Sequence, residues 1–495
     1  MSAIGYFLAT IILTLLITAW AARKATSKAS LYSASGTIGP TQNGFALAGD
    51  FLSAGTVLGI VGLYFTVGVD VSLYFMAPMA GLCLLLLFIV GPLRRLGTFT
   101  LGDVLASRFS DPRLRVMVGI CTIVISLINL VAQLVGAGAL ISILFGPSFA
   151  LSVLIVATLM GVYVVFGGML AATWVQIIKA AILIATIGAL AFLCMRHTDG
   201  IIAVFDRIRT GPESAKLLSF GGLGLGLFSA LSLGIAEVTG IMGTPHLLIR
   251  FFTVPDAKAA RRSLVVATTL IGIAMGTIFL VVSPAAVVLV GADPAFRNPD
   301  GSILGGVNMV TMHLARILGG NPFVGLMSAV AFSTILAVVA GLTIAISSAA
   351  SHDVLGALRR DNKLSDREEI WWFRCSAVAT CIVAALLSIL FKAQNLTFLI
   401  VMGYTVASCT TFPLLILSIY WPGFSPRGAL WCASVGLVTS VGGIILGPAV
   451  WDKVLGLGTA PISTDYPTLV ALPLALLAAW LGSNAKTAQP MPVAQ

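Results

Sequence analysis

Charged residues are scarce in this chain. Asp, Glu, Lys and Arg make up only 9% of its 495 residues, against about 25% in soluble domains. This scarcity excludes an ordinary soluble globular domain. The segments between the apolar runs are also short, none longer than about 30 residues, which leaves no room for a separate soluble catalytic domain.

Residues suited to metal binding or covalent chemistry are few and dispersed. The seven cysteines lie in apolar runs and none forms a CxxC pair, so neither a zinc site nor a disulfide framework is indicated. The four histidines are equally scattered, and we find no paired nucleophile and base. We therefore predict that the chain is not an enzyme and has no cofactor and no metal centre.

Long apolar runs dominate instead, since 58% of the residues are hydrophobic. About 20 apolar residues are enough for a helix to cross a bilayer. Thirteen such runs are present, at 4–22, 44–67, 69–92, 114–144, 149–166, 172–195, 222–244, 263–291, 322–351, 370–391, 395–420, 427–447 and 465–483. The pattern predicts an all-α integral membrane protein with about 13 transmembrane helices.

Basic residues predict the orientation of these helices. No basic residue precedes the first run, whereas Arg23, Lys24 and Lys28 follow it, so we expect a retained helix with its N-terminus outside. Thirteen spans then place the C-terminus in the cytoplasm. The predicted inner segments hold 18 of the 28 lysines and arginines, and the outer loops hold 8. The net charge of +10 thus indicates membrane topology and not nucleic-acid binding.

Two runs, 44–67 and 222–244, combine many glycines with one carboxylate each, Asp50 and Glu237. Glycine is tolerated in a membrane helix where unwound backbone lines a cavity. Because the two runs lie five spans apart, they predict a five-plus-five inverted repeat with its binding site near the bilayer midplane. Close helix packing is the alternative reason for the glycines.

The predicted organisation follows from this repeat. It comprises an N-terminal helix and inner loop (1–43), a first repeat (44–195), an outer loop (196–221), a second repeat (222–420), two C-terminal helices (421–483) and a disordered cytoplasmic tail (484–495).

Several motifs resemble one transporter family. YVVFGGMLAATWVQIIKA (163–180), GTPHLLIRFFT (243–253) and SSAASHD (347–353) are similar to segments of the sodium:solute symporter family. AQLVGAG (132–138) and the QNG, AGD and SA segments between 42 and 54 resemble the bacterial cation/acetate symporters, or acetate permeases. The resemblance implies alternating access by an inverted-repeat core in the bacterial cytoplasmic (inner) membrane.

The family also implies a cation site between the broken first core helix and the eighth core helix. Its carbonyl ligands map to Gly49 and Leu52. Thr334, Ala337 and Val338 stand at the helix-eight positions, and shifting by one residue gives Ser333, Leu336 and Ala337 instead. Neither register supplies the two hydroxyls that the family uses. Gln176 also stands where many members have an acid.

Lys179 and Asp50 are the ionisable groups nearest that cation position. The Lys179 ammonium could occupy the vacant sodium position, or its amine could reach the inner interface by snorkelling. Asp50 could neutralise a cation, pair with Lys179, or cap the unwound segment.

Glu237 has three open interpretations. It could couple transport to protons, indicate a substrate other than simple acetate, or pair with another helix. Ser53, Thr56 and Gln133 are candidate donors for a substrate carboxylate, beside the amides of the unwound backbone. His246 and Arg250 match a family motif at the end of the seventh run, and we interpret them as gate or structural residues.

We expect a secondary active transporter that imports acetate or a related short-chain monocarboxylate with sodium or a proton. A symporter-like membrane sensor, or a carrier for another small solute, is the alternative. The predicted partners are a small carboxylate and the lipid bilayer, with no nucleic acid; the sequence does not indicate an oligomeric state.

Overall fold

The computed structural model describes residues 38–53, 55–96, 100–211, 214–358 and 365–484, together with residues 5, 9, 12 and 16. Helices account for most of these residues, and the one β feature among them is an isolated bridge between Arg297 and Ile303. The predicted first span and the predicted disordered tail lie almost entirely outside the described residues. The all-α prediction is confirmed.

The first half of the described chain contains ten helical elements. They are α3 (Pro40–Phe51), η2 (Gly55–Gly59), α4 (Ile60–Val67), η3 (Gly68–Ser72), α5 (Leu73–Leu84), η4 (Leu85–Ile89), α6 (Val90–Leu96), α7 (Leu101–Ala106), α8 (Pro112–Phe145) and α9 (Phe149–His197). Two short helices, α10 (Ile201–Thr210) and α11 (Ser214–Leu218), follow.

The second half of the described chain begins with helices that contribute residues to the site described below. Its elements are α12 (Leu227–Gly243), α13 (Pro245–Leu248), η5 (Ile249–Phe252), α14 (Ala257–Thr277), η6 (Ile278–Val282), α15 (Ser283–Gly291), η7 (Pro294–Phe296), η8 (Val307–Met309), α16 (Val310–Ser348), η9 (Ala349–Leu355), α17 (Gly356–Leu358), α18 (Asp366–Leu390), α19 (Leu396–Cys409) and α20 (Thr411–Tyr420). The C-terminal elements are α21 (Pro426–Leu446), α22 (Pro448–Trp451) and α23 (Thr468–Asn484).

Nine helices within the described ranges are long and apolar enough to cross a membrane. One of them, Gly55–Leu96, contains parts of the predicted spans 44–67 and 69–92. The chain turns at Gly68 (φ 66°), but the helical segments before and after this turn follow each other without a gap, so they count as one. Two shorter apolar helices, Phe149–Gly161 and Thr468–Asn484, fall where spans 149–166 and 465–483 were predicted. The number of long helices in the structure therefore differs from the thirteen predicted spans largely because consecutive helices are divided at different points.

Helix α9 shows this most clearly. The predicted spans 149–166 and 172–195 form one assigned helix of 49 residues. A straight helix of that length would measure about 74 Å, more than twice the thickness of a hydrocarbon core of about 30 Å. Its two apolar segments thus fit two membrane crossings better than one.

Capping residues and kinks set several helix boundaries. The Asp111 side chain accepts a hydrogen bond from the Arg113 amide and begins α8, and Asp256 caps α14 in the same way. Helix α16 is kinked at Gly320 (φ 62°), two residues before Pro322. The kink falls where the predicted span 322–351 begins.

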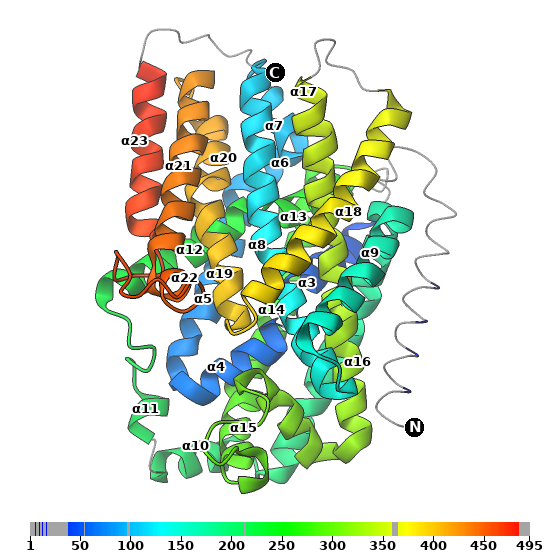
Figure 1. Ribbon diagram of the computed structural model, residues 1–495, viewed down its shortest axis with the longest axis vertical. Helices are drawn as coiled ribbons and strands as arrows, with labels where there is room; N and C mark the ends of the chain where they lie inside the picture. The colour runs from blue at the N-terminus through cyan, green and yellow to red at the C-terminus, as the bar shows by residue number, and fades with distance from the viewer. Residues whose placement is uncertain are drawn as a thin grey trace.

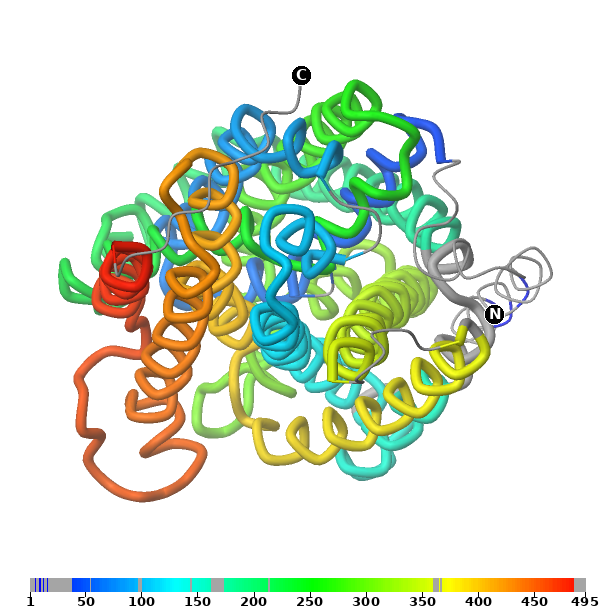
Figure 2. Tube along the Cα trace, turned by 90° about the horizontal axis from the view of Figure 1, so that it is seen from above, coloured from blue at the N-terminus to red at the C-terminus, as the bar shows by residue number. Residues whose placement is uncertain are grey.

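Helices α8, α16 and α19 form the interior of the bundle. In the most apolar window of Val307–Leu358, 89% of the residues are buried, against 33% in Pro426–Leu446. Figure 2 shows α21 and α23 side by side at one edge of the molecule. Loop segments predicted on opposite sides of the membrane also separate, with α7 and α17 at one end of Figure 1 and α10 and α11 at the other.

Candidate functional site

The second predicted run is broken, as the glycine pattern indicated. Helix α3 ends at Phe51, and Leu52 (φ −73°, ψ 88°) leaves the helical conformation before the π-helix η2 begins at Gly55. The Thr56 hydroxyl accepts a hydrogen bond from the Ser53 amide (3.2 Å) and donates one to the Phe51 carbonyl (3.1 Å). Thr56 thereby replaces helical hydrogen bonds that the break removes.

A small cavity of about 50 Å³ lies beside this break. Ser53 and Thr56 line it from the broken helix, Glu237 from α12, and Thr397 and Tyr404 from α19. We call this space the central cavity. It brings together three residues that the sequence nominated, Ser53, Thr56 and Glu237.

Gln133, the third predicted substrate donor, is not among the residues that line the central cavity. It is buried on α8, and its Oε1 atom has no hydrogen-bond partner among the described residues. The structure thus leaves Gln133 as a buried polar group with unused hydrogen-bonding capacity, apart from the other two.

The amine of Lys179 lies against the end of α3. Its Nζ donates a hydrogen bond to the Gly49 carbonyl and a second one to Gln176 Oε1 (3.0 Å). Lys179 is only 3% exposed, so the amine points into the protein and does not snorkel toward an interface. The amine nitrogen therefore contacts one of the two carbonyls that the family resemblance assigned to a cation.

Asp50 pairs with Arg250 and not with Lys179. Arg250 Nε lies 2.5 Å from Asp50 Oδ2, and its Nη2 lies 3.3 Å from Oδ1, so the contact is bidentate. Gln176 Nε2 donates to Asp50 Oδ1 (2.5 Å), and Arg250 Nη1 donates to the Thr173 hydroxyl (2.7 Å). We call Asp50, Thr173, Gln176, Lys179 and Arg250 the ion-pair cluster.

Arg250 lies deeper in the protein than its position at the end of the seventh predicted run indicates. It is buried (1% exposed) against Asp50. A break in the helix explains this placement. Helix α12 ends at Gly243, Thr244 is extended (φ −75°, ψ 112°), and a second short helical segment then carries Arg250 back into the protein.

The helix is shifted toward the C-terminus relative to the predicted span 222–244. The start of that span lies outside the helix, where Gly224 (φ 64°) forms a turn with the preceding Gly221 (φ 116°). The Asp70 carboxylate accepts hydrogen bonds from the amides of Gly221 and Leu223 and holds this turn. The candidate membrane span, broken at Thr244, extends over Leu227–Phe252 and contains Glu237, His246 and Arg250. The Nδ1 atom of His246 is buried and has no hydrogen-bond partner among the described residues.

Helix α16 supplies few oxygen ligands where the family resemblance expects them. The Thr334 hydroxyl donates to the Val330 carbonyl of its own helix (2.6 Å), and Ala337 and Val338 have no hydroxyl. The helix does approach the ion-pair cluster, because a Cβ atom on Gly341 would lie 3.5 Å from Asp50 Oδ1. Gly49 is closer still to α9, since a Cβ there would lie 2.7 Å from the Gln176 carbonyl oxygen.

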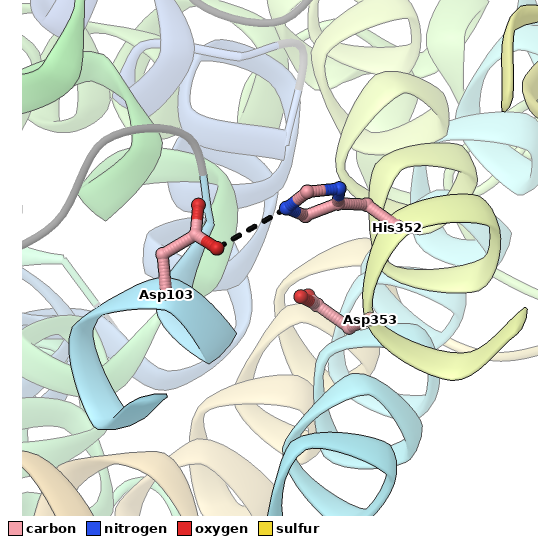
Figure 3. A group of neighbouring side chains, drawn as sticks. All are labelled: Asp103, His352 and Asp353. Atoms are coloured by element: carbon pink, nitrogen blue, oxygen red, sulfur yellow. Dashed lines mark hydrogen bonds and ion pairs between the residues drawn. The ribbon is translucent and has the colours of Figure 1, made fainter. Parts of the chain in front are cut away.

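A second group of ionisable residues, none of which was a candidate site residue in the sequence analysis, lies at the α7 end of the molecule (Figure 3). Asp103 on α7 faces His352 and Asp353 on η9, with 3.1 Å between Asp103 Oδ1 and His352 Nε2. The spacing of these three side chains would suit a metal ion. Arg115 occupies their centre, however, with Nη2 2.6 Å from Asp103 Oδ1 and Nε 3.2 Å from Asp353 Oδ1.

A guanidinium in that position repels a metal cation, so the group is better described as an ionic link between α7, α8 and η9. Burial opposes ionisation of Asp103, but the hydrogen bond from His352 and the charge of Arg115 hold its pKa below the ordinary 3.8. SHD at 351–353 was the sequence signal for this link, and it gave no indication of Asp103 or Arg115 as partners.

Comparisons with known proteins agree with this geometry. The sequence profile of the sodium:solute symporter family matches residues 31–436. A Na⁺-coupled sialic acid symporter in a substrate-bound, outward-open state has a similar structure, with a TM-score of 0.77, 15% sequence identity and 99% of each chain covered. A nucleobase-cation-symport-1 family transporter, closed around bromovinylhydantoin, matches with a TM-score of 0.54, 13% identity and 92% of each chain covered.

The two structural likenesses establish the fold, an all-helical inverted-repeat symporter core. The profile match covers most of the chain, and it supports sodium as a coupling cation. The chain thus belongs to the sodium:solute symporter family, as a multi-pass membrane protein that carries a solute with a cation and is not an enzyme.

Proposed function

We propose that this symporter imports acetate or a related short-chain monocarboxylate across the bacterial cytoplasmic membrane, with its N-terminus outside and its C-terminus inside. The size of the central cavity carries the proposal. Pockets for drug-sized ligands measure about 300–1,000 Å³, and one water molecule takes about 30 Å³ in the liquid. A cavity of about 50 Å³ suits a solute with only a few non-hydrogen atoms.

The sequence segments shared with the cation/acetate symporters support the same substrate class. The backbone around Ser53 is unwound beside the cavity, and such backbone offers donors to a carboxylate without a basic side chain. Gln133, although buried apart from the lining, remains a candidate donor for another state of the transport cycle. A carrier for another small solute would use the same cavity with different polar contacts.

For coupling, we propose that the Lys179 ammonium fills part of the position that sodium takes in other members. Its hydrogen bond to the Gly49 carbonyl and the lack of paired hydroxyls at Thr334, Ala337 and Val338 support this assignment. Leu52 would contribute the second carbonyl. The carrier would then use a proton on Lys179, or a sodium ion elsewhere, to drive uptake.

Uptake of labelled acetate into proteoliposomes tests both parts of the proposal, with sodium and pH gradients imposed separately at a clamped membrane potential. We expect accumulation above the level in protein-free vesicles, and at least a tenfold loss in Lys179→Ala. If neither gradient drives accumulation, the monocarboxylate assignment fails. If sodium alone drives uptake and Lys179→Ala retains it, acetate remains the substrate but the ammonium has no role in coupling.

A further inference from the structure

Glu237 is the one acidic side chain that lines the central cavity in the described part of the chain. It is 2% exposed, and its Oε2 atom has no hydrogen-bond partner among the described residues. No lysine, arginine or histidine is among the described lining residues either. The carboxyl thus faces a space where none of the described residues supplies a counter-ion or a hydrogen-bond donor.

The other titratable side chains among the described lining residues are phenols. Tyr74 on α5 and Tyr404 on α19 line the cavity, and Tyr466 lies behind Tyr74. The hydroxyls of Tyr74 and Tyr466 bond each other across 3.3 Å. None of these groups supplies a positive charge that would stabilise an ionised Glu237.

Burying an ionised carboxylate without a partner costs several kcal/mol, so such a group takes up a proton or binds a cation. A monocarboxylate substrate in the same small cavity makes the cost larger, because two carboxylates in contact cannot both stay ionised. One proton held between the two carboxyl groups removes the repulsion and forms a short, strong hydrogen bond.

We propose that Glu237 determines specificity by holding a proton and donating it, as a hydrogen bond, to the substrate carboxylate. The inference rests on the proposed function. The O–H bond stays on Glu237 while the substrate oxygen accepts, so no other proton donor is required. The cavity then prefers small monocarboxylates, while ammonium ions of the same size lack the acceptor that a neutral Glu237 needs.

Binding of labelled acetate to the purified full chain in detergent tests this, and it avoids leakage of acetic acid through vesicles. Glu237→Gln keeps an N–H donor in place of the O–H, and we expect it to bind acetate within about threefold of the parent protein. Glu237→Leu removes the donor and should bind at least tenfold more weakly, in line with hydrogen bonds to charged groups of about 1.5–3 kcal/mol. Asp206→Asn, on the exposed face of α10, is the matched control for loss of a carboxylate and should leave binding unchanged.

The pH profile and the infrared spectrum separate this role from a structural one. Parent binding should weaken toward alkaline pH by up to tenfold per pH unit once the proton is lost, whereas Glu237→Gln binding should stay flat. The carbonyl stretch of a protonated carboxylic acid should change when acetate binds and should be missing in Glu237→Gln.

Three results would overturn the inference while leaving acetate as the substrate. These are a Glu237→Gln affinity as low as that of Glu237→Leu, no protonated-acid band in the parent protein, and methylammonium competing with acetate at the site. If the parent protein binds no acetate at any pH, the proposed function itself fails.

Discussion

The ion-pair cluster and the central cavity lie at the two sides of the same helix break, yet they treat charge in opposite ways. In the cluster, Asp50, Lys179 and Arg250 all have partners at hydrogen-bond distance. In the cavity, Glu237 Oε2 has none within the described residues. Satisfied buried networks fix a conformation, whereas a buried polar atom without a partner needs its own explanation, and for Glu237 the adjoining cavity supplies space for a ligand.

The largest expected effect comes from breaking the cluster. Arg250→Leu leaves Asp50 buried without its counter-ion and should lower the free energy of unfolding by about 3–5 kcal/mol. Denaturation in detergent, followed by fluorescence, measures the loss. Asp50→Asn combined with Arg250→Leu should restore part of it.

Arg207→Leu is the control for this change, because Arg207 and Asp199 form an exposed ion pair at 3.4 Å. Such pairs contribute about 0–1 kcal/mol. Equal losses in Arg250→Leu and Arg207→Leu would contradict the view that burial makes the cluster important.

Removing the cluster's amine should have the next largest effect. Lys179→Met deprives the Gly49 carbonyl and Gln176 Oε1 of a charged donor, which should cost about 1.5–3 kcal/mol of unfolding free energy.

Adding Ala337→Ser and Val338→Ser to Lys179→Ala supplies the missing hydroxyls and should make thermal stability depend on sodium. A melting temperature for this triple variant that sodium does not shift would argue against a vacant cation site there.

A substitution in the central cavity should change the free energy of unfolding in the opposite direction. Glu237→Leu replaces an unpartnered carboxyl by an apolar group of similar size and should raise the free energy of unfolding by about 1–2 kcal/mol, or leave it unchanged. The same denaturation assay measures it, in the absence of substrate. A loss comparable with that of Arg250→Leu would mean that Glu237 is a structural residue, and the contrast between the two regions would disappear.

The smallest effect is expected at the ionic link around Arg115. Because the folded-state pKa of Asp103 lies below its ordinary value, its ionised form stabilises the fold above about pH 4, and this contribution is lost as pH falls through the folded-state pKa. Asp103→Asn should cost about 1 kcal/mol at pH 7. The difference between variant and parent should shrink in unfolding measurements below pH 4, and a constant difference would contradict this origin.

The local sequence predicted the ion-pair cluster better than it predicted the central cavity. The glycines and Asp50 indicated the break between α3 and η2, because unwound backbone needs residues that tolerate it. Lys179 could be placed beside Gly49 through a family resemblance. The contact between Asp50 and Arg250 could not be predicted in this way, since 200 residues separate them and only tertiary packing brings them together.

The seventh run shows where the pattern misleads. Gly221 and Gly224 form a turn with positive φ, and the real break lies at Thr244, which is not a glycine. Glycine content alone does not distinguish a loop from an unwound helix. The environment of Glu237 could not be predicted for a different reason. Its important feature is the lack of a hydrogen-bond partner at Oε2 among the described residues, and a sequence does not show which contacts fail to form.

Gly49 limits how this transporter can change over generations. Because a methyl group at that position would overlap the Gln176 backbone carbonyl, every substitution there separates α3 from α9. Backbone packing thus holds in place the carbonyl that the Lys179 amine contacts. Under the proposed coupling by Lys179, engineering of ion preference is best begun at the side chains of positions 176, 179, 337 and 338, and not at Gly49.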